Sequence, residues 1–202
     1  MMKLITEELL DTVTSQAKEN SRLRMNYNFH ASMDAPIHRL LNALEPGTYL
    51  PPHRHTDKEE TYLVLRGSLL AFFYDDAGNV TDKVCLNPSE GKYGLEIPSN
   101  TWHSIIALES GTVIFEIKKG PYQPLPSEDL ASWAPQTSDT EGIKAFIKRM
   151  LELLLSNILL RASIHAPTIP ALSFSLEVII TESLFTRFRE YFLTAVFIGC
   201  VM

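Results

Sequence analysis

Cysteine is scarce in this chain of 202 residues, and its two copies, Cys85 and Cys200, lie far apart in the sequence. They do not make the disulfide framework of a small secreted domain, and no Cys-x-x-Cys motif offers a structural zinc site or a redox centre. The N-terminal residues MMKLITEELL place acids where a signal peptide would need its apolar stretch. We therefore expect a cytoplasmic protein.

Excess basic charge and long apolar runs are also lacking. The net charge is -6, and no basic stripe or DNA-binding motif accompanies it, which argues against nucleic acid as the main partner. The longest uncharged run, residues 162–176, spans 15 residues and contains two prolines, whereas a transmembrane helix needs about 20 apolar residues. We expect no membrane span and a small molecule as the partner.

The chain does contain a series of short segments rich in β-branched and aromatic residues. With 45% hydrophobic and 21% charged residues, its composition is that of a globular domain with one core. Short strands at such spacing, without intervening helices, indicate an antiparallel sandwich or barrel. The expected strands cover residues 37–44, 61–65, 68–74, 80–86, 103–108 and 112–118.

Helical patterns lie at the two ends of this series. A helix is predicted over residues 6–18, capped by Thr6, and a second one follows a capping-box sequence at Ser138 to Glu141. Residues 22–30 are dense in polar groups and predict a loop held by hydrogen bonds. The expected organisation is an N-terminal helix and loop (1–36), a barrel (37–135) and a C-terminal helical extension (136–202). Within that extension, 176–180 could form a strand and 182–197 a helix.

Two histidines and a glutamate make the first candidate site. On a β-strand, residues i and i+2 point to the same face, so His53 and His55 can converge. Glu60 begins the next apolar run and can sit at the mouth of a neighbouring strand. Further on, His103 heads another apolar run after a turn at Asn100, a residue type that tolerates positive φ. The four side chains are candidate ligands for one metal ion.

These residues resemble the first cupin motif, G-x5-H-x-H-x4-E-x6-G, which runs here from Gly47 to Gly67 with every spacing kept. The second motif, G-x5-P-x-G-x2-H-x3-N, is matched by Pro98 and His103. It departs at its remaining positions: the first glycine lies one residue too far upstream, and Asn100 and Ala107 replace the second glycine and the asparagine. The resemblance implies a cupin-type antiparallel jelly-roll barrel with a bound metal.

The chain is similar, more specifically, to the WbuC family of cupin-fold metalloproteins over roughly residues 5–135. The similarity rests on RLRMNYNFH, RLLNALEPGTY, HRHT, VLRG, EIPSNTWH and GPY. It implies a metal-binding protein encoded near genes for surface polysaccharide synthesis. Three imidazoles and one carboxylate accept Zn, Fe, Mn, Ni or Cu, so the ligands do not identify the metal.

Three functions are compatible with such a site. The first is an isomerase, epimerase or lyase acting on a carbohydrate-derived molecule. The second is a protein that binds a sugar or metabolite through the metal without catalysis, and the third is an Fe(II)-dependent dioxygenase. Exposed sheet edges and the many apolar segments lead us to expect a homodimer.

Other residues have both a functional and a structural interpretation. Asn28 and His30, with Asn26, could line the pocket or tie a loop to the barrel. Arg39 and Arg54 could hold an anionic substrate, or lie on the solvent face of a strand. Trp102 could stack on a sugar ring or pack in the barrel. His38 has no partner pattern and is expected to be a surface or satisfied core histidine.

Overall fold

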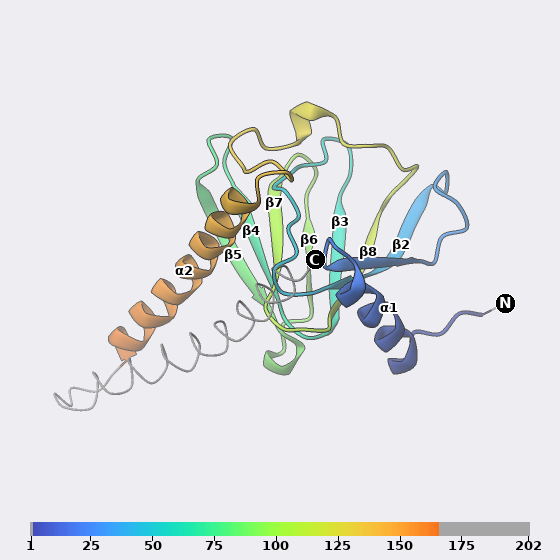
Figure 1. Ribbon diagram of the computed structural model, residues 1–202, viewed down its shortest axis with the longest axis horizontal. Helices are drawn as coiled ribbons and strands as arrows, with labels where there is room; N and C mark the ends of the chain where they lie inside the picture. Colours follow the sequence, from blue (N-terminus) through green and yellow to red (C-terminus); the bar gives the residue numbers. More distant parts are fainter. Residues whose placement is uncertain (1, 166–202) are drawn as a thin grey trace, which may run out of the picture. The chain divides into compact units, whose positions relative to one another are not determined.

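Two antiparallel sheets dominate the structure, a computed structural model that describes residues 2–165 and their side chains up to residue 154. One sheet has five strands in the order β1-β2-β8-β3-β6, and the other has three in the order β5-β4-β7 (Figure 1). The mainly β fold class, with two antiparallel sheets and a helix at either end, is confirmed. The strands are β1 (Arg24–Asn28), β2 (Ile37–Leu44), β3 (Glu60–Arg66), β4 (Leu69–Tyr74), β5 (Val80–Leu86), β6 (Gly94–Ile97), β7 (Trp102–Ala107) and β8 (Thr112–Lys119).

The N-terminal helix α1 (Glu7–Glu19) begins and packs as its sequence predicts. The Thr6 side chain accepts a hydrogen bond from the Leu9 amide at 3.3 Å, which caps the helix. The buried face of α1 covers the outer face of the five-stranded sheet. Its core cluster consists of Leu10, Val13, Ala17, Leu41, Ala43 and Val113.

The C-terminal helix α2 (Thr140–His165) begins with a cap other than the predicted one. Asp139 Oδ1, and not Ser138, accepts the hydrogen bond from the Gly142 amide at 2.9 Å. The reason is that the helix starts at Thr140, so the residue just before it supplies the cap. Short 3-10 turns are formed by η1 (Pro88–Glu90) and η2 (Ser127–Asp129). The strand and helix expected at 176–180 and 182–197 lie outside the described residues.

The predicted loop at 22–30 is wrong, because residues 24–28 form the edge strand β1, which pairs with β2 along its whole length. The alternation of a strand is present in the sequence, but its inward face is polar. Met25 and Tyr27 pack against the cluster under α1, while Asn26 and Asn28 line a cavity between the sheets. A strand with a polar inner face resembles a loop when only its content of polar residues is considered and their alternation along the strand is ignored.

The space between the sheets is apolar at one end and polar at the other. Along β8 the inward residues run from Ile114, which is fully buried in the apolar core, through Glu116 to Lys118. Both charged residues line the cavity. The same strand therefore contributes to the apolar core at one end and supplies charged groups to the cavity at the other.

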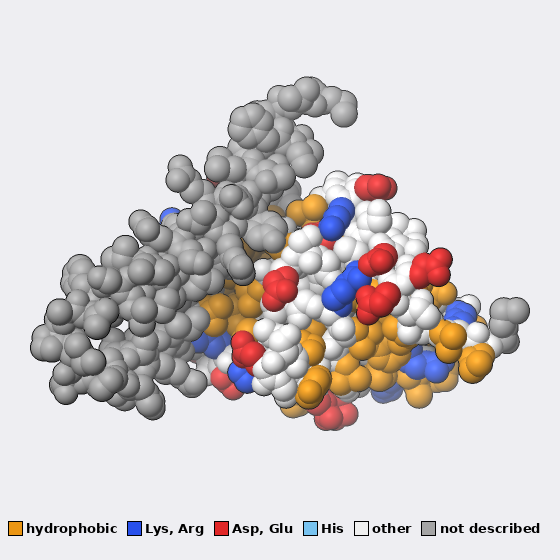
Figure 2. Space-filling view, turned by 90° about the horizontal axis from the view of Figure 1, so that it is seen from below, with side chains coloured by type: hydrophobic (Ala, Val, Ile, Leu, Met, Phe, Trp, Pro, Cys, Tyr) orange, Lys and Arg blue, Asp and Glu red, His pale blue; other side chains and the backbone are white. Residues whose placement is uncertain are grey.

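Turn and surface features follow the sequence. Asn100 and Gly78 have φ values of 60° and 84°, so both adopt the left-handed conformation that their turns require. On the described part of the face shown in Figure 2, basic side chains lie among acidic ones, and no basic patch gathers there. In the described part of the chain, no helix combines the length and apolar character needed to cross a membrane.

Candidate metal centre

Backbone hydrogen bonds place His53 and His103 side by side. The His53 amide donates to the His103 carbonyl at 3.0 Å, and the His103 amide donates to the His53 carbonyl at 2.9 Å. Such a reciprocal pair is one rung of an antiparallel ladder, so both side chains leave the same face. The imidazole centroids are 4.4 Å apart. One rung thus places two candidate nitrogen ligands side by side from segments fifty residues apart in the sequence.

Each of these imidazoles is oriented by a carbonyl two residues earlier. His53 Nδ1 lies 2.9 Å from the Pro51 carbonyl oxygen, and His103 Nδ1 lies 2.9 Å from the Thr101 carbonyl oxygen. A carbonyl only accepts, so each Nδ1 carries the proton and each Nε2 presents a lone pair. This arrangement is how proteins usually fix the tautomer and direction of a metal-ligating histidine.

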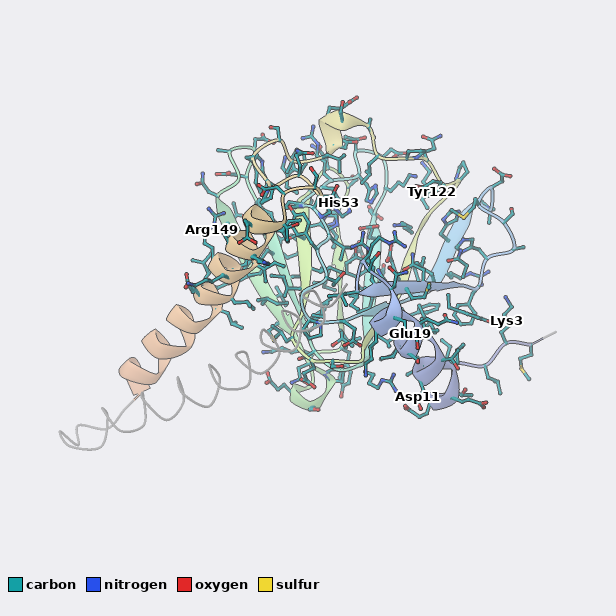
Figure 3. All side chains as sticks on the ribbon, viewed as in Figure 1. Lys3, Asp11, Glu19, His53, Tyr122 and Arg149 are labelled. Carbon is teal, nitrogen blue, oxygen red and sulfur yellow. The ribbon has the colours of Figure 1, made fainter. Side chains whose placement is uncertain are left out.

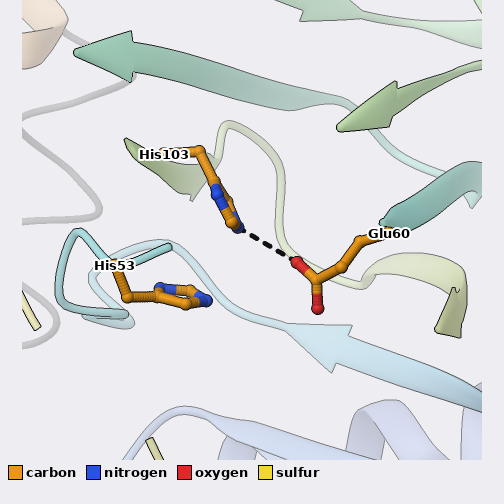
Figure 4. A group of neighbouring side chains, drawn as sticks. All are labelled: His53, Glu60 and His103. Carbon is orange, nitrogen blue, oxygen red and sulfur yellow. Dashed lines mark ion pairs between the residues drawn. The ribbon is translucent and has the colours of Figure 1, made fainter. Parts of the chain in front are cut away.

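The carboxylate of Glu60, at the start of β3, faces these imidazoles. Oε2 lies 3.1 Å from His103 Nε2 (Figure 4), and Tyr62 donates its hydroxyl proton to the same oxygen at 2.8 Å. Lys118 Nζ donates to Oε1 at 3.0 Å. The side chain is 2% exposed, so these contacts compensate a buried charge.

His55 lies on the other side of the carboxylate. Its Nε2 is 3.2 Å from Glu60 Oε1, and its carbonyl oxygen accepts a hydrogen bond from the Asn100 amide at 2.6 Å. Ligand atoms of His53, Glu60 and His103 all lie within 4.8 Å of one another. The structure thus brings three of the four predicted ligands into one cluster, and His55 lies beside it, with its ring centroid 5.2 Å from that of His53.

Burial and neighbouring charges shift the pKa values at this centre. Burial, together with the nearby His103, lowers the pKa of His53 to about 3, so the ring is neutral at pH 7. Burial raises the pKa of Glu60, but the neighbouring His103 and His55 imidazoles and the charge of Lys118 outweigh it and hold this pKa well below its usual value. A neutral imidazole at His53 and an ionised carboxylate at Glu60 are the protonation states that metal ligation requires.

The donor set therefore fits a divalent metal. His55 Nε2 and His103 Nε2 are buried and have no hydrogen-bond partner, although each lies near a carboxylate oxygen. The ligand atoms of His53, Glu60 and His103, all within 4.8 Å of one another, are close enough to converge on one ion after small side-chain movements. Nitrogen and oxygen donors of this kind suit Zn, Fe, Mn, Ni or Cu.

A cavity of about 210 Å³ adjoins the cluster. His53 points into the interior between the sheets, whereas Tyr122 lies at the rim (Figure 3), where it is 55% exposed. The cavity wall comes largely from the inward residues of β1, β2, β3 and β8. Its polar members are Arg24, Asn26, Asn28, His30, His38, Asn42, His53, Glu60, Tyr62, Glu116, Lys118 and Tyr122.

A second set of contacts holds the segment that carries His53 and His55. Arg54, between the two histidines, donates from Nε to Asp129 Oδ1 at 3.0 Å, and its guanidinium lies 4.6 Å from the centre of a Trp102 ring. The Arg54 amide also donates to the Asp129 carbonyl at 3.0 Å. Asp129 is 4% exposed. We call Arg54 and Asp129 the clamp, because they fix the ligand segment from outside the metal cluster.

The other predicted binding residues divide into two groups. Asn28 and His30 line the cavity, whereas Arg39 and Trp102 do not. Arg39 is exposed on the outer face of β2, and Trp102 is buried, with its Nε1 donating to Asp76 at 2.9 Å. His38 is a satisfied core histidine, since it is 3% exposed and its Nε2 lies 3.0 Å from the Met33 carbonyl oxygen.

Sequence reasoning missed several residues at the site. Glu116 and Lys118 carry a usable signal, because charges at alternate positions of an apolar strand must face inward or outward together. Asn42 interrupts the inward face of β2 in the same way. Asp129 gives no such signal, since it lies in a proline-rich segment about 75 residues from its partner Arg54.

Comparison with known proteins gives a family match over part of the chain and similarity of fold. A family model described as a domain of unknown function, DUF6016, matches residues 5–86, which include three of the predicted ligands and end before His103. It does not carry the WbuC name. No curated protein matches the chain in sequence.

Among solved structures, KdgF from Halomonas sp. is 17% identical, with 50% of this chain and 82% of that chain covered and a TM-score of 0.40. A cupin superfamily protein from Desulfitobacterium hafniense DCB-2 is 18% identical, with coverages of 48% and 76% and a TM-score of 0.39. Oxalate decarboxylase from Lactobacillus farciminis is 16% identical, with coverages of 49% and 29% and a TM-score of 0.39. At these values the similarity says nothing about activity.

Proposed function

We propose that this protein binds one divalent transition metal through His53, His55, Glu60 and His103, and that it holds a small polar molecule in the adjoining cavity. The observation that supports this most is the orientation of His53 and His103. Their Nδ1 atoms contact backbone carbonyls, which leaves their Nε2 lone pairs for a metal beside a buried carboxylate. The metal is Zn, Fe, Mn, Ni or Cu, because all accept this donor set.

The groups around the cavity suit the movement of a proton on the bound molecule. When present, the metal would polarise a carbonyl or hydroxyl oxygen as a Lewis acid. Burial lowers the pKa of Lys118, but the charges of Glu116 and Glu60 raise it by more than that. This pKa therefore lies above its usual value, and the ammonium stays protonated. Burial and the neighbouring Glu60 hold the pKa of Tyr62 well above its usual value. Both side chains can therefore hold a proton near a reacting oxygen.

We therefore assign an isomerase, epimerase or lyase reaction on a carbohydrate-derived molecule. The assignment to surface polysaccharide synthesis rests on the resemblance to the WbuC family in RLRMNYNFH, HRHT and EIPSNTWH. A cytoplasmic location and a homodimer complete the proposal. Both rest on the sequence: on the scarcity of cysteine for the first, and on sheet edges for the second.

Solvent exchange tests the reaction directly. The full chain loaded with Zn(II), Mn(II) or Fe(II) is incubated in deuterated water with hexoses, hexose phosphates and hexuronic acids, and proton NMR follows the carbon-bound hydrogens. We expect deuterium to enter beside the carbonyl group of at least one sugar, because proton removal at that carbon precedes isomerisation, epimerisation and elimination. His55→Ala should lose this exchange, whereas Asp57→Ala, at an exposed position of the same loop, should retain it. If a sugar bound but no deuterium entered it with any of the three metals, the catalytic assignment would be contradicted.

A further inference from the structure

Strands β1 and β2 give the cavity a wall of uncharged polar side chains. Asn26 lies opposite Asn42 in the register of the two strands, and Asn28 and His30 follow Asn26 at intervals of two. Residues two apart point to the same face of a strand, and all four side chains line the cavity. Three primary amides and an imidazole on the inner face of a sheet are not needed to pack a core.

Two atoms of this wall are buried without a hydrogen-bond partner, Asn42 Oδ1 and His30 Nε2. The residues are 5% and 7% exposed. Asn42 uses its amide group to donate to Glu116 Oε2 at 3.3 Å, which leaves its oxygen as a free acceptor. His30 Nδ1 lies 3.2 Å from the Arg39 amide nitrogen and 3.1 Å from the Arg39 carbonyl oxygen, so its Nε2 is a free donor in one tautomer and a free acceptor in the other. Folded proteins rarely leave such atoms unpaired.

The charged groups of the cavity already have partners of their own. Lys118 Nζ lies 2.6 Å from Glu116 Oε1 and 3.0 Å from Glu60 Oε1. Arg24 donates from Nη1 to the Tyr49 carbonyl at 2.7 Å. The buried atoms of the β1–β2 wall that lack a partner are therefore one imidazole nitrogen and one amide oxygen, and hydroxyl groups match both in either tautomer because each hydroxyl both donates and accepts.

The separation of the two atoms sets the size of the ligand. His30 stacks on His38 at a centroid distance of 4.1 Å, and His38 is four residues from Asn42 along β2, about 13 Å at the strand rise. One hydroxyl cannot serve both positions. The cavity volume of about 210 Å³ is also far above the roughly 10–15 Å³ that a single water needs.

We infer that the β1–β2 wall recognises a polyhydroxylated small molecule, a sugar or a polyol, with His30 Nε2 hydrogen-bonded to one hydroxyl and Asn42 Oδ1 accepting from another. This rests on the proposed function, because it names the ligand class for the same cavity. The cluster of His53, Glu60 and His103 lies at the His30 end, since Glu60, Lys118 and His38 occupy one row across the sheet. The ligand extends from that end along β2.

The test uses D-glucose and D-sorbitol as probes and 1,6-hexanediol as a matched compound that lacks the inner hydroxyls. Each is titrated by ligand-observed NMR into the Zn(II)-loaded full chain and into the same chain after chelation. The variants are Asn42→Leu and His30→Phe, which remove the two unpaired polar atoms, and His30→Gln, which keeps a group that can donate and accept. Arg39→Ala is the control, because Arg39 is exposed on the other face of β2.

We expect at least one polyol to bind the wild-type chain with millimolar affinity and hexanediol to bind more weakly. Asn42→Leu and His30→Phe should each weaken polyol binding by about five- to a hundredfold, the cost of a lost hydrogen bond to a buried group. His30→Gln and Arg39→Ala should remain within about twofold of wild type, well below that cost. Circular dichroism checks folding, and Asn42→Ala replaces Asn42→Leu if the larger side chain does not fold.

Two outcomes would overturn the inference. One is no polyol binding at tens of millimolar, which would mean that the wall holds water only. The other is equal polyol binding by wild type, Asn42→Leu and His30→Phe. Metal content, measured on the same samples, distinguishes a failure of this inference from a failure of the proposed metal centre. A chain that takes up no metal but loses polyol binding in Asn42→Leu would refute the metal centre and support the wall.

Discussion

Replacing Glu60 with alanine is expected to abolish stoichiometric metal binding and to lower the free energy of unfolding by about 3–5 kcal/mol. The side chain is 2% exposed and is the common partner of His55, His103, Lys118 and Tyr62. Its removal takes away a metal ligand and leaves the Lys118 ammonium with Glu116 alone. Elemental analysis of the purified variant measures the first effect, and urea denaturation measures the second.

The matched control is the neighbouring residue Glu59. This side chain is exposed, so Glu59→Ala should retain metal and change stability by less than about 0.5 kcal/mol. If Glu60→Ala kept one metal per chain, the ligand set proposed for the cluster would be wrong. If metal were lost without any loss of stability in the metal-free protein, the buried carboxylate would contribute no net stability to the fold.

Replacing Asp129 with alanine should weaken metal binding by about ten- to a hundredfold, although Asp129 lies outside the metal cluster. Groups that orient metal ligands have effects of this size. Asp129 holds Arg54 through a part-buried hydrogen bond of 3.0 Å, and Arg54 sits between two of the proposed ligands. Without the carboxylate the ligand segment keeps its backbone contacts but loses the side-chain contact that fixes its position. Competition with a chromophoric chelator measures the change in affinity.

Glu128→Ala is the control for the clamp. Glu128 is the exposed neighbour of Asp129 in the same 3-10 turn, and its removal should leave metal affinity unchanged. Equal affinities for Asp129→Ala and wild type would show that the ligand segment is positioned by its backbone hydrogen bonds alone. Equal losses in Glu128→Ala and Asp129→Ala would show that the turn, and not the clamp, is responsible.

Periodicity and turn chemistry predicted most of the barrel. Ile37–Leu44 and Val80–Leu86 occupy the predicted residues, because apolar strands bounded by clear turns have unambiguous ends. Asn100 adopts the positive φ that the turn before β7 requires. The motif spacing also identified His53, Glu60 and His103, which the fold brings within 4.8 Å of one another.

The sequence did not predict the partners that complete the site. The sequence predicts a loop at β1 because its inward residues are asparagines, which line the cavity and are themselves exposed. Lys118 contacts Glu60 through the pairing of β3 with β8, and Asp129 contacts Arg54 across about 75 residues. Contacts between distant segments depend on strand register and on the course of a connection, neither of which local patterns determine.

Anomalous diffraction from crystals of the full chain tests the central claim most directly. The chain is purified without added chelator, and data are collected at the absorption edges of iron, manganese, nickel, copper and zinc. We predict one anomalous peak per chain, about 2.0–2.2 Å from the Nε2 atoms of His53, His55 and His103 and from a Glu60 oxygen if the metal is zinc. The absence of any peak at this position, from crystals grown with the metals supplied, would contradict the account.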